Sequence, residues 1–250
     1  MLNINLEKIK DMDFKMREAF KALRSNVQFC GSDIKVVSIT SCVPNEGKSV
    51  VTLNLAISMA ESGKKVLFID ADMRKSVLIG RYKINKAIKG LTQYLSGSEP
   101  LSEITYSTNV DNLDMILSGP VPPNPSELLD GEYFRRMISK TRDEYDYVII
   151  DTPPIGQVID PAIVARQTDG VIFLIAQGSV SYKYAQKQFE QMKKSGCKIL
   201  GVVLNKVDPE NNGVGSGYSS SGYYGYGYGY YGYNNYGYAG NNNTDENESK

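Results

Sequence analysis

The chain has 250 residues and a formal net charge of zero, with 41% hydrophobic and 22% charged residues. This composition is typical of a globular protein, and the lack of net positive charge argues against a nucleic-acid partner. There is no histidine, which excludes histidine-based general bases, catalytic triads and zinc sites. The three cysteines, Cys30, Cys42 and Cys197, are far apart without metal-ligand spacing, so we expect a reducing compartment and no disulfide framework.

A helix is predicted over residues 13–28, after a polar segment at 1–12 that we expect to be loose. Hydrophobic residues from Phe14 onward recur near helical spacing, with charged residues between them. Glu18, Lys21 and Arg24 are spaced three apart, so they share one side of the helix. That side is either a solvated face with ion pairs between neighbouring turns or a contact between subunits.

The next motif is the loop Ser-Cys-Val-Pro-Asn-Glu-Gly-Lys-Ser at 41–49, between a predicted buried strand at 36–40 and a predicted helix at 50–60. This order is that of a phosphate-binding P-loop, where backbone N–H groups and the helix dipole favour an anion. We expect Lys48 to reach the terminal phosphates and the Ser49 hydroxyl to bind Mg²⁺. The usual pattern has glycine in place of Cys42, and the alternative is an ordinary strand-to-helix turn. The candidate nucleotide-binding residues are Pro44, Asn45, Glu46, Gly47, Lys48, Ser49 and Val50.

Two further predicted strands, at 65–70 and 147–151, end in aspartate. The first continues as Asp-Ala-Asp-Met-Arg from Asp70, and the second ends at Asp151 in a Walker B pattern. The carboxyl ends of strands bind ligands in open α/β sheets, and carboxylates two apart on an extended backbone face the same way. We therefore predict Ser49, Asp70 and Asp151 as magnesium ligands. Asp70 or Asp72 would accept the proton of a nucleophile, and we favour Asp72.

The remaining elements complete an α/β pattern. Strands are predicted at 113–117, 171–176 and 199–204, the last two buried. Helices are predicted at 90–95, 100–105, 126–140 and 182–195, with a stiff proline-rich loop at 119–125. The alternation predicts a P-loop NTPase with a mostly parallel sheet covered by helices on both faces. No apolar window is long enough to span a bilayer.

The sequence Asn-Lys-Val-Asp at 205–208 is a weak match to the guanine-reading motif of GTPases. It leaves a GTPase as one alternative, and we interpret Asn205 as an adenine contact instead.

The composition changes at residue 209, which divides the chain into a domain at 1–208 and a tail at 209–250. Gly, Asn, Ser and Tyr dominate the tail, so it cannot bury a core and we expect disorder. It is either a low-complexity binding segment or a substrate with many hydroxyls. Its tyrosines are Tyr218, Tyr223, Tyr224, Tyr226, Tyr228, Tyr230, Tyr231, Tyr233, Tyr236 and Tyr238.

The three motifs and the tail together resemble the bacterial tyrosine kinases (BY-kinases) of capsule and exopolysaccharide operons, across nearly the whole chain. Residues 40–49 are similar to the family's Walker A motif, 68–74 to Walker A′ and 148–151 to Walker B. Residues 119–129 are similar to its Pro-Pro-Asn-Pro segment. Glu18-x-x-Lys21-x-x-Arg24 resembles the E-x-x-R-x-x-R helix of its ring-shaped oligomers, with lysine replacing the middle arginine.

The resemblance implies an ATP- and Mg²⁺-dependent protein-tyrosine kinase that phosphorylates its own tail in trans and controls polysaccharide chain length. It implies the Gram-positive type, which is cytoplasmic and recruited to the inner membrane face by a separate transmembrane modulator, with an opposing tyrosine phosphatase. The same fold contains Par/Min-type ATPases, which carry an extra lysine where this chain has Val43. Such an ATPase, or a nucleotide-switched scaffold without kinase activity, is the alternative.

Overall fold

The structure is a computed structural model that describes residues 3–6, 12–81 and 89–207. The predicted tail at 209–250, with its tyrosines, lies outside these residues, as does Asp208 of the predicted Asn-Lys-Val-Asp match. In the described part, no helix combines the length and the apolar character needed to cross a membrane.

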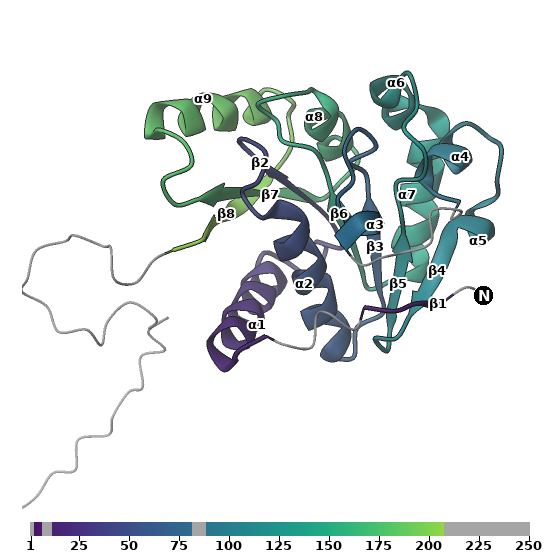
Figure 1. The fold of residues 1–250 in the computed structure, drawn as a ribbon, viewed down its shortest axis with the longest axis horizontal. Helices are drawn as coiled ribbons and strands as arrows, with labels where there is room; N and C mark the ends of the chain where they lie inside the picture. Colours follow the sequence, from purple (N-terminus) through teal and green to yellow (C-terminus); the bar gives the residue numbers. More distant parts are fainter. Residues whose placement is uncertain (1–2, 7–11, 82–88, 208–250) are drawn as a thin grey trace, which may run out of the picture. The chain divides into compact units, whose positions relative to one another are not determined.

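The described residues form a central eight-stranded sheet in the order β1-β4-β5-β3-β6-β2-β7-β8 (Figure 1). Every neighbouring pair is parallel except β4 and β5, which are antiparallel. The predicted mostly parallel sheet is therefore confirmed. The strands are β1 (Asn3–Ile4), β2 (Val36–Ser41), β3 (Val66–Asp70), β4 (Thr105–Thr108), β5 (Leu113–Ile116), β6 (Tyr147–Asp151), β7 (Gly170–Ala176) and β8 (Ile199–Asn205).

Helices cover both faces of the sheet, as predicted. The central strands are fully buried, and alternate residues enter different hydrophobic clusters. Val37 and Ile39 pack with α1 and α2, whereas Val36 packs with α7 and α8 on the other face. The helices are α1 (Phe14–Phe29), α2 (Lys48–Glu61), α3 (Leu78–Arg81), α4 (Leu91–Leu95), α5 (Leu101–Ile104), α6 (Pro125–Asp130), α7 (Glu132–Glu144), α8 (Asp160–Ala165) and α9 (Tyr182–Lys193).

Within the described residues, α3, α8 and β4 are not among the elements predicted from the sequence, and three further elements differ from their predictions. The helix predicted at 126–140 is two helices, because the chain is extended at Gly131 (φ −74°, ψ 166°), between α6 and α7. The strand predicted as buried at 199–204 is β8, an edge strand on which Val202 and Leu204 are 54% and 58% exposed. The segment predicted to be loose contains β1, which pairs with β4.

Candidate nucleotide-binding and catalytic site

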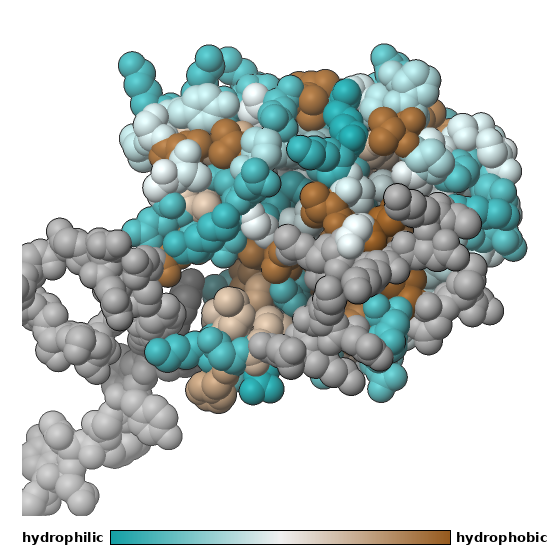
Figure 2. All heavy atoms as spheres, in the orientation of Figure 1, coloured by the Kyte–Doolittle hydropathy of each residue, from teal (hydrophilic) through white to brown (hydrophobic). Residues whose placement is uncertain are grey.

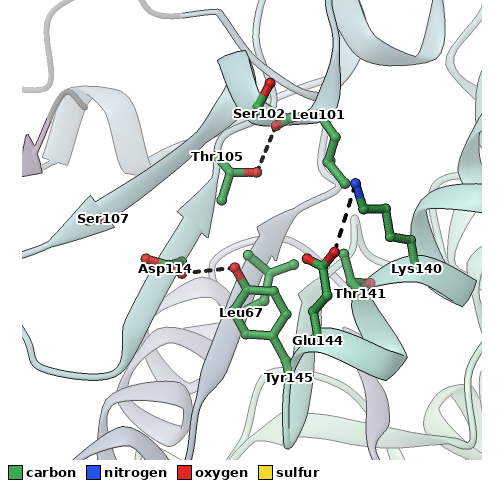
Figure 3. A pocket seen from close by; sticks show the side chains of 10 residues that line it. All are labelled: Leu67, Leu101, Ser102, Thr105, Ser107, Asp114, Lys140, Thr141, Glu144 and Tyr145. Atoms are coloured by element: carbon green, nitrogen blue, oxygen red, sulfur yellow. Dashed lines mark hydrogen bonds and ion pairs between the residues drawn. The ribbon is translucent and has the colours of Figure 1, made fainter.

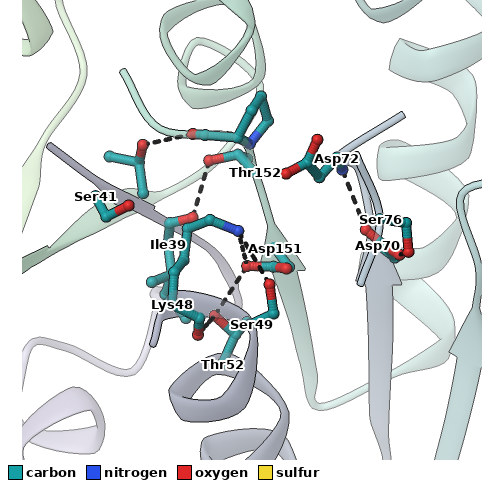
Figure 4. Close-up of polar contacts among 12 residues, drawn as sticks. Ile39, Ser41, Lys48, Ser49, Thr52, Asp70, Asp72, Ser76, Asp151 and Thr152 are labelled. Carbon is teal, nitrogen blue, oxygen red and sulfur yellow. Dashed lines mark hydrogen bonds and ion pairs between the residues drawn. The ribbon is translucent and has the colours of Figure 1, made fainter. Parts of the chain in front are cut away.

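The predicted P-loop and the three aspartates meet at one edge of the sheet. The strands β3, β6 and β2 are neighbours, and all three run in the same direction. Their carboxyl ends therefore lie side by side, and Asp70 is the direct register partner of Asp151. Lys48 lies in the first turn of α2, directly after the loop, and its ammonium contacts the carboxylate of Asp151 at the end of β6 (Figure 4).

The loop between β2 and α2 has the backbone of a tight phosphate-binding turn. Asn45 and Gly47 both have positive φ, at 65° and 93°, and Gly47 is the N-cap of α2. Asparagine and glycine are the residues that tolerate this conformation most readily. Cys42, which replaces the usual glycine, does not have positive φ. Its side chain is fully buried in a hydrophobic cluster, and burial together with the nearby Glu46 carboxylate raises its pKa to about 12.

Lys48 and Asp151 form a buried ion pair, with Nζ 2.6 Å from Oδ1. Thr52, one turn further along α2, also donates to Oδ1 at 3.2 Å. The other carboxylate oxygen of Asp151, Oδ2, is buried and has no hydrogen-bond partner among the described residues. The Ser49 hydroxyl lies nearby, 3.3 Å from Lys48 Nζ. A buried carboxylate oxygen without a partner, next to a hydroxyl group, suits a magnesium ion.

The donor set is open rather than a closed metal cage. Within the described ranges, no group of three or more Asp, Glu, Cys or His side chains converges on one point. Mg²⁺ usually keeps several water molecules and binds one or two carboxylates together with substrate phosphates. The residues present therefore fit Mg²⁺ that arrives with a nucleotide.

Asp70 and Asp72 have different surroundings although they are two residues apart. Asp70 is 1% exposed, accepts a short hydrogen bond from Ser76, and has a pKa raised to about 7 by burial and by the charge of Asp151. Asp72 is 8% exposed and accepts a hydrogen bond from the backbone N–H of Lys75. Burial also raises its pKa, although the ammonium of Lys48 acts in the opposite direction.

Two predicted nucleotide-binding side chains are engaged within the protein. The Glu46 carboxylate is 1% exposed and accepts hydrogen bonds from the backbone of Val43 and Ala176 and from the Ser179 hydroxyl. The Asn205 amide donates to the Glu46 carbonyl at 2.7 Å. Pro44 is exposed, whereas Ser49 and Val50 are half-buried in the first turn of α2.

The structure adds a polar cluster that sequence reasoning missed. The Arg74 guanidinium, two residues after Asp72, forms a bidentate ion pair with the fully buried Asp160 at 2.8 and 3.0 Å. Ser126 donates to the same carboxylate at 2.8 Å and accepts from Arg74 at 2.9 Å. The cluster ties the Asp-x-Asp loop to the start of α8 and to α6. Arg74 and Asp160 are 86 positions apart, and no motif in the sequence indicates that they pair.

The three residues predicted at a subunit contact lie on α1 but differ in their partners. Glu18 and Lys21 form an exposed ion pair of 2.7 Å within the helix. The Arg24 guanidinium instead donates to the Ser58 carbonyl of α2 at 2.6 Å, so part of it is used inside the chain.

A separate pocket of about 220 Å³ lies beside α5, β4, β5 and α7, and includes none of the predicted nucleotide-binding residues (Figure 3). The Tyr145 hydroxyl donates to the Asp114 carboxylate at 2.8 Å in this pocket. The lining is Leu67, Leu101, Ser102, Thr105, Ser107, Asp114, Lys140, Thr141, Glu144 and Tyr145.

Comparison with known proteins gives a consistent family. Residues 34–199 match an AAA domain family. Tyrosine-protein kinase CpsD of Streptococcus agalactiae serotype III is 46% identical over 209 residues, which are 81% of this chain and 90% of that protein. The kinase domain of Escherichia coli tyrosine kinase ETK superposes with a TM-score of 0.74 at 33% identity, covering 84% of this chain and 80% of that structure.

Septum site-determining protein MinD of Pyrococcus horikoshii, solved in complex with Mg-ADP, is a more distant structural relative. Its TM-score is 0.58 at 25% identity, with 68% of this chain and 70% of that structure covered.

Proposed function

Because the chain belongs to the bacterial tyrosine-protein kinases, we propose that it transfers the γ-phosphoryl group of ATP to tyrosines at 209–250 of another copy of itself. The observation that carries this proposal is the meeting of Lys48, Asp151, Asp70 and Asp72 at one edge of the sheet. Phosphoryl transfer needs mainly positioning and charge neutralisation, and this edge supplies a cation, carboxylates and loop amides.

Each residue has a role in this scheme. Lys48 leaves the carboxylate of Asp151 to neutralise the β- and γ-phosphates, while backbone N–H groups of residues 45–50 bind them. Ser49 and Asp151 would hold Mg²⁺, and Asp70 would help to hold it. The metal, when bound, neutralises charge on the phosphate oxygens. Asp72, the more exposed aspartate of the pair, accepts the proton of the incoming tyrosine hydroxyl. We keep Asn205 as a candidate adenine contact.

The same proposal extends to partners. The chain would act in capsule or exopolysaccharide synthesis, recruited to the inner face of the plasma membrane by a transmembrane modulator and opposed by a phosphatase. Its oligomer would form through α1. Two observations on this helix support a contact surface: Phe14 and Phe29 are 69% and 72% exposed, and hydrophobic surface is visible over the region of α1 (Figure 2).

Phosphotyrosine mapping by mass spectrometry tests the kinase function. The full chain is incubated with Mg·ATP, with and without the modulator's cytoplasmic peptide, beside Lys48→Met. We expect phosphate on tyrosines between Tyr218 and Tyr238 that is absent from Lys48→Met. No phosphotyrosine in either condition, with ATP still bound or hydrolysed, would favour a partitioning-type ATPase or a scaffold.

A further inference from the structure

One charged side chain of the P-loop points away from the place where phosphates bind. Glu46 is 1% exposed, and both oxygens of its carboxylate accept hydrogen bonds from the protein. Oε2 accepts the backbone N–H of Val43 at 2.9 Å, at the start of the same loop. Oε1 accepts the N–H of Ala176 at 3.1 Å and the hydroxyl of Ser179 at 2.6 Å. The carboxylate therefore joins the loop to the end of β7 and to the turn that follows it.

Asn205, the last residue of β8, and Lys206, which follows it, bind backbone carbonyl groups of the loop. The amide of Asn205 donates to the carbonyl of Glu46 at 2.7 Å, and the ammonium of Lys206 donates to the carbonyl of Asn45 at 2.6 Å. There is little free space at this contact, since a side chain on Gly47 would place its Cβ 2.3 Å from the Asn205 amide nitrogen.

These contacts determine the direction of the loop's N–H groups. A trans peptide is planar, so the carbonyl of one residue and the N–H of the next point in opposite directions. When Lys206 holds the Asn45 carbonyl, the N–H of Glu46 points the opposite way. In the same way, when Asn205 holds the Glu46 carbonyl, the N–H of Gly47 points away from Asn205. Anion binding in a P-loop needs successive N–H groups aimed at one point.

We propose that Glu46 is a positioning residue whose carboxylate, with Asn205 and Lys206, sets the P-loop backbone in its phosphate-binding form before nucleotide arrives. The side chains of Glu46 and Lys206, which need not touch the nucleotide, then control its affinity. This inference rests on the proposed binding of ATP at the P-loop. It also explains why glutamate suits position 46. A carboxylate offers two acceptor oxygens, which match donors on both sides, whereas an amide would turn its NH₂ group toward one of them.

The test compares the full-length wild type with Glu46→Gln, Ser179→Ala and, as a control, the exposed Glu61→Gln at the end of α2. The dissociation constant of Mg·ATP is measured by calorimetry. Hydrogen exchange over residues 43–48 is measured without nucleotide. We expect Glu46→Gln to weaken Mg·ATP binding about tenfold or more and to speed exchange of the loop. Steady-state kinetics should show a raised KM for ATP with kcat less affected, because ground-state binding is lost.

Ser179→Ala is the milder variant, because the single hydroxyl proton of Ser179 has a second acceptor in the Ala176 carbonyl at 2.8 Å. It removes one donor from Glu46 and should give a smaller change in the same direction. The inference would be overturned if both variants kept the wild-type affinity for Mg·ATP and the wild-type hydrogen exchange of the loop. It would also be overturned if Glu46→Gln lowered the melting temperature but left the affinity for Mg·ATP unchanged. If the wild type fails to bind Mg·ATP, the proposed function fails, while loop exchange still decides the role of Glu46.

Discussion

At the scale of single residues, Asp70 and Asp72 are equivalent in the sequence but not in the structure. Asp70 is bonded to the Ser76 hydroxyl and paired in register with Asp151, whereas Asp72 retains more exposure. We expect Asp72→Asn to lower kcat about 100-fold or more while Mg·ATP still binds, because a general base contributes about that much. Asp70→Asn should instead raise the Mg²⁺ concentration that the reaction requires, because a carboxylate that helps to hold the ion is lost. Single-turnover phosphorylation at saturating and limiting Mg²⁺ separates the two, and the reverse pattern would make Asp70 the base.

Asn45 gives a second residue-scale prediction, because it holds positive φ without being glycine. An alanine in this conformation costs about 1–2 kcal/mol, whereas glycine adopts it freely. Asn45→Ala should therefore lower the free energy of unfolding by about 1 kcal/mol, and Asn45→Gly should stay close to wild type. Urea unfolding of both variants measures this, and equal losses in the two would contradict the strain argument.

The site could be anticipated from sequence to the extent that it depends on strand order. Lys48 and Asp151 are 103 residues apart but meet because β2 and β6 are parallel neighbours. The partners of Glu46 were not predictable, since they lie on β7 and the following turn and carry no motif. The same holds for Asp160, whose role appears only when α8 packs beside the Asp-x-Asp loop.

At the scale of elements, Asp169 joins three parts of the fold before β7 begins. Its carboxylate accepts the backbone N–H groups of Lys35 and Val36 at 2.9 and 2.8 Å, beside the start of β2. It also pairs with Arg142 of α7 at 2.6 Å. Burial acts to raise the pKa of Asp169, but the Arg142 guanidinium and the two N–H donors outweigh it and lower the pKa below its ordinary value.

Asp169→Asn should therefore lower the free energy of unfolding at neutral pH by about 2 kcal/mol, through loss of charge-assisted hydrogen bonds. Because the folded-state pKa is lowered, this stabilisation is fully present above the unfolded value of about 3.9 and is lost as pH falls through the folded value. Urea unfolding across pH should show wild type and variant converging in acid. Asp111→Asn, at an exposed position, serves as the control. If the difference in free energy of unfolding between wild type and Asp169→Asn stayed the same in acid, the charge of Asp169 would not be the source of the stabilisation.

Three of the differences between prediction and structure arise where tertiary contacts override the local pattern. Residues 126–140 have the periodicity of one amphipathic helix, yet the chain is extended at Gly131, where a Cβ would lie 3.1 Å from the Leu128 carbonyl. The strand β8 is as apolar as a buried strand, and its edge position follows from topology alone. Asn3 and Ile4 carry too little pattern to predict pairing with β4.

At the scale of the whole molecule, α1 is both part of the core and a candidate contact surface. Phe20 and Val27 are buried in a hydrophobic cluster with residues of α2 and of the sheet, and the Arg24 guanidinium donates to the Ser58 carbonyl of α2. Glu18 and Lys21 remain exposed, near the 50% exposed Met16. The outer side of the helix can therefore engage another subunit while Arg24 keeps the helix in place.

A kinase whose substrate is its own tail would change the charge of that oligomer with each cycle. Each phosphotyrosine adds about −1.5 to −2 charges, so several per tail would make neighbouring tails repel one another. We expect phosphorylation to loosen the oligomer, and more so at low salt, where screening is weak. Gel filtration with light scattering compares the protein after incubation with Mg·ATP, the same sample after phosphatase treatment, and Lys48→Met. Phosphorylated protein should elute as the smaller species and return to the larger one after dephosphorylation. Identical elution of the three samples would mean that tail charge does not control assembly.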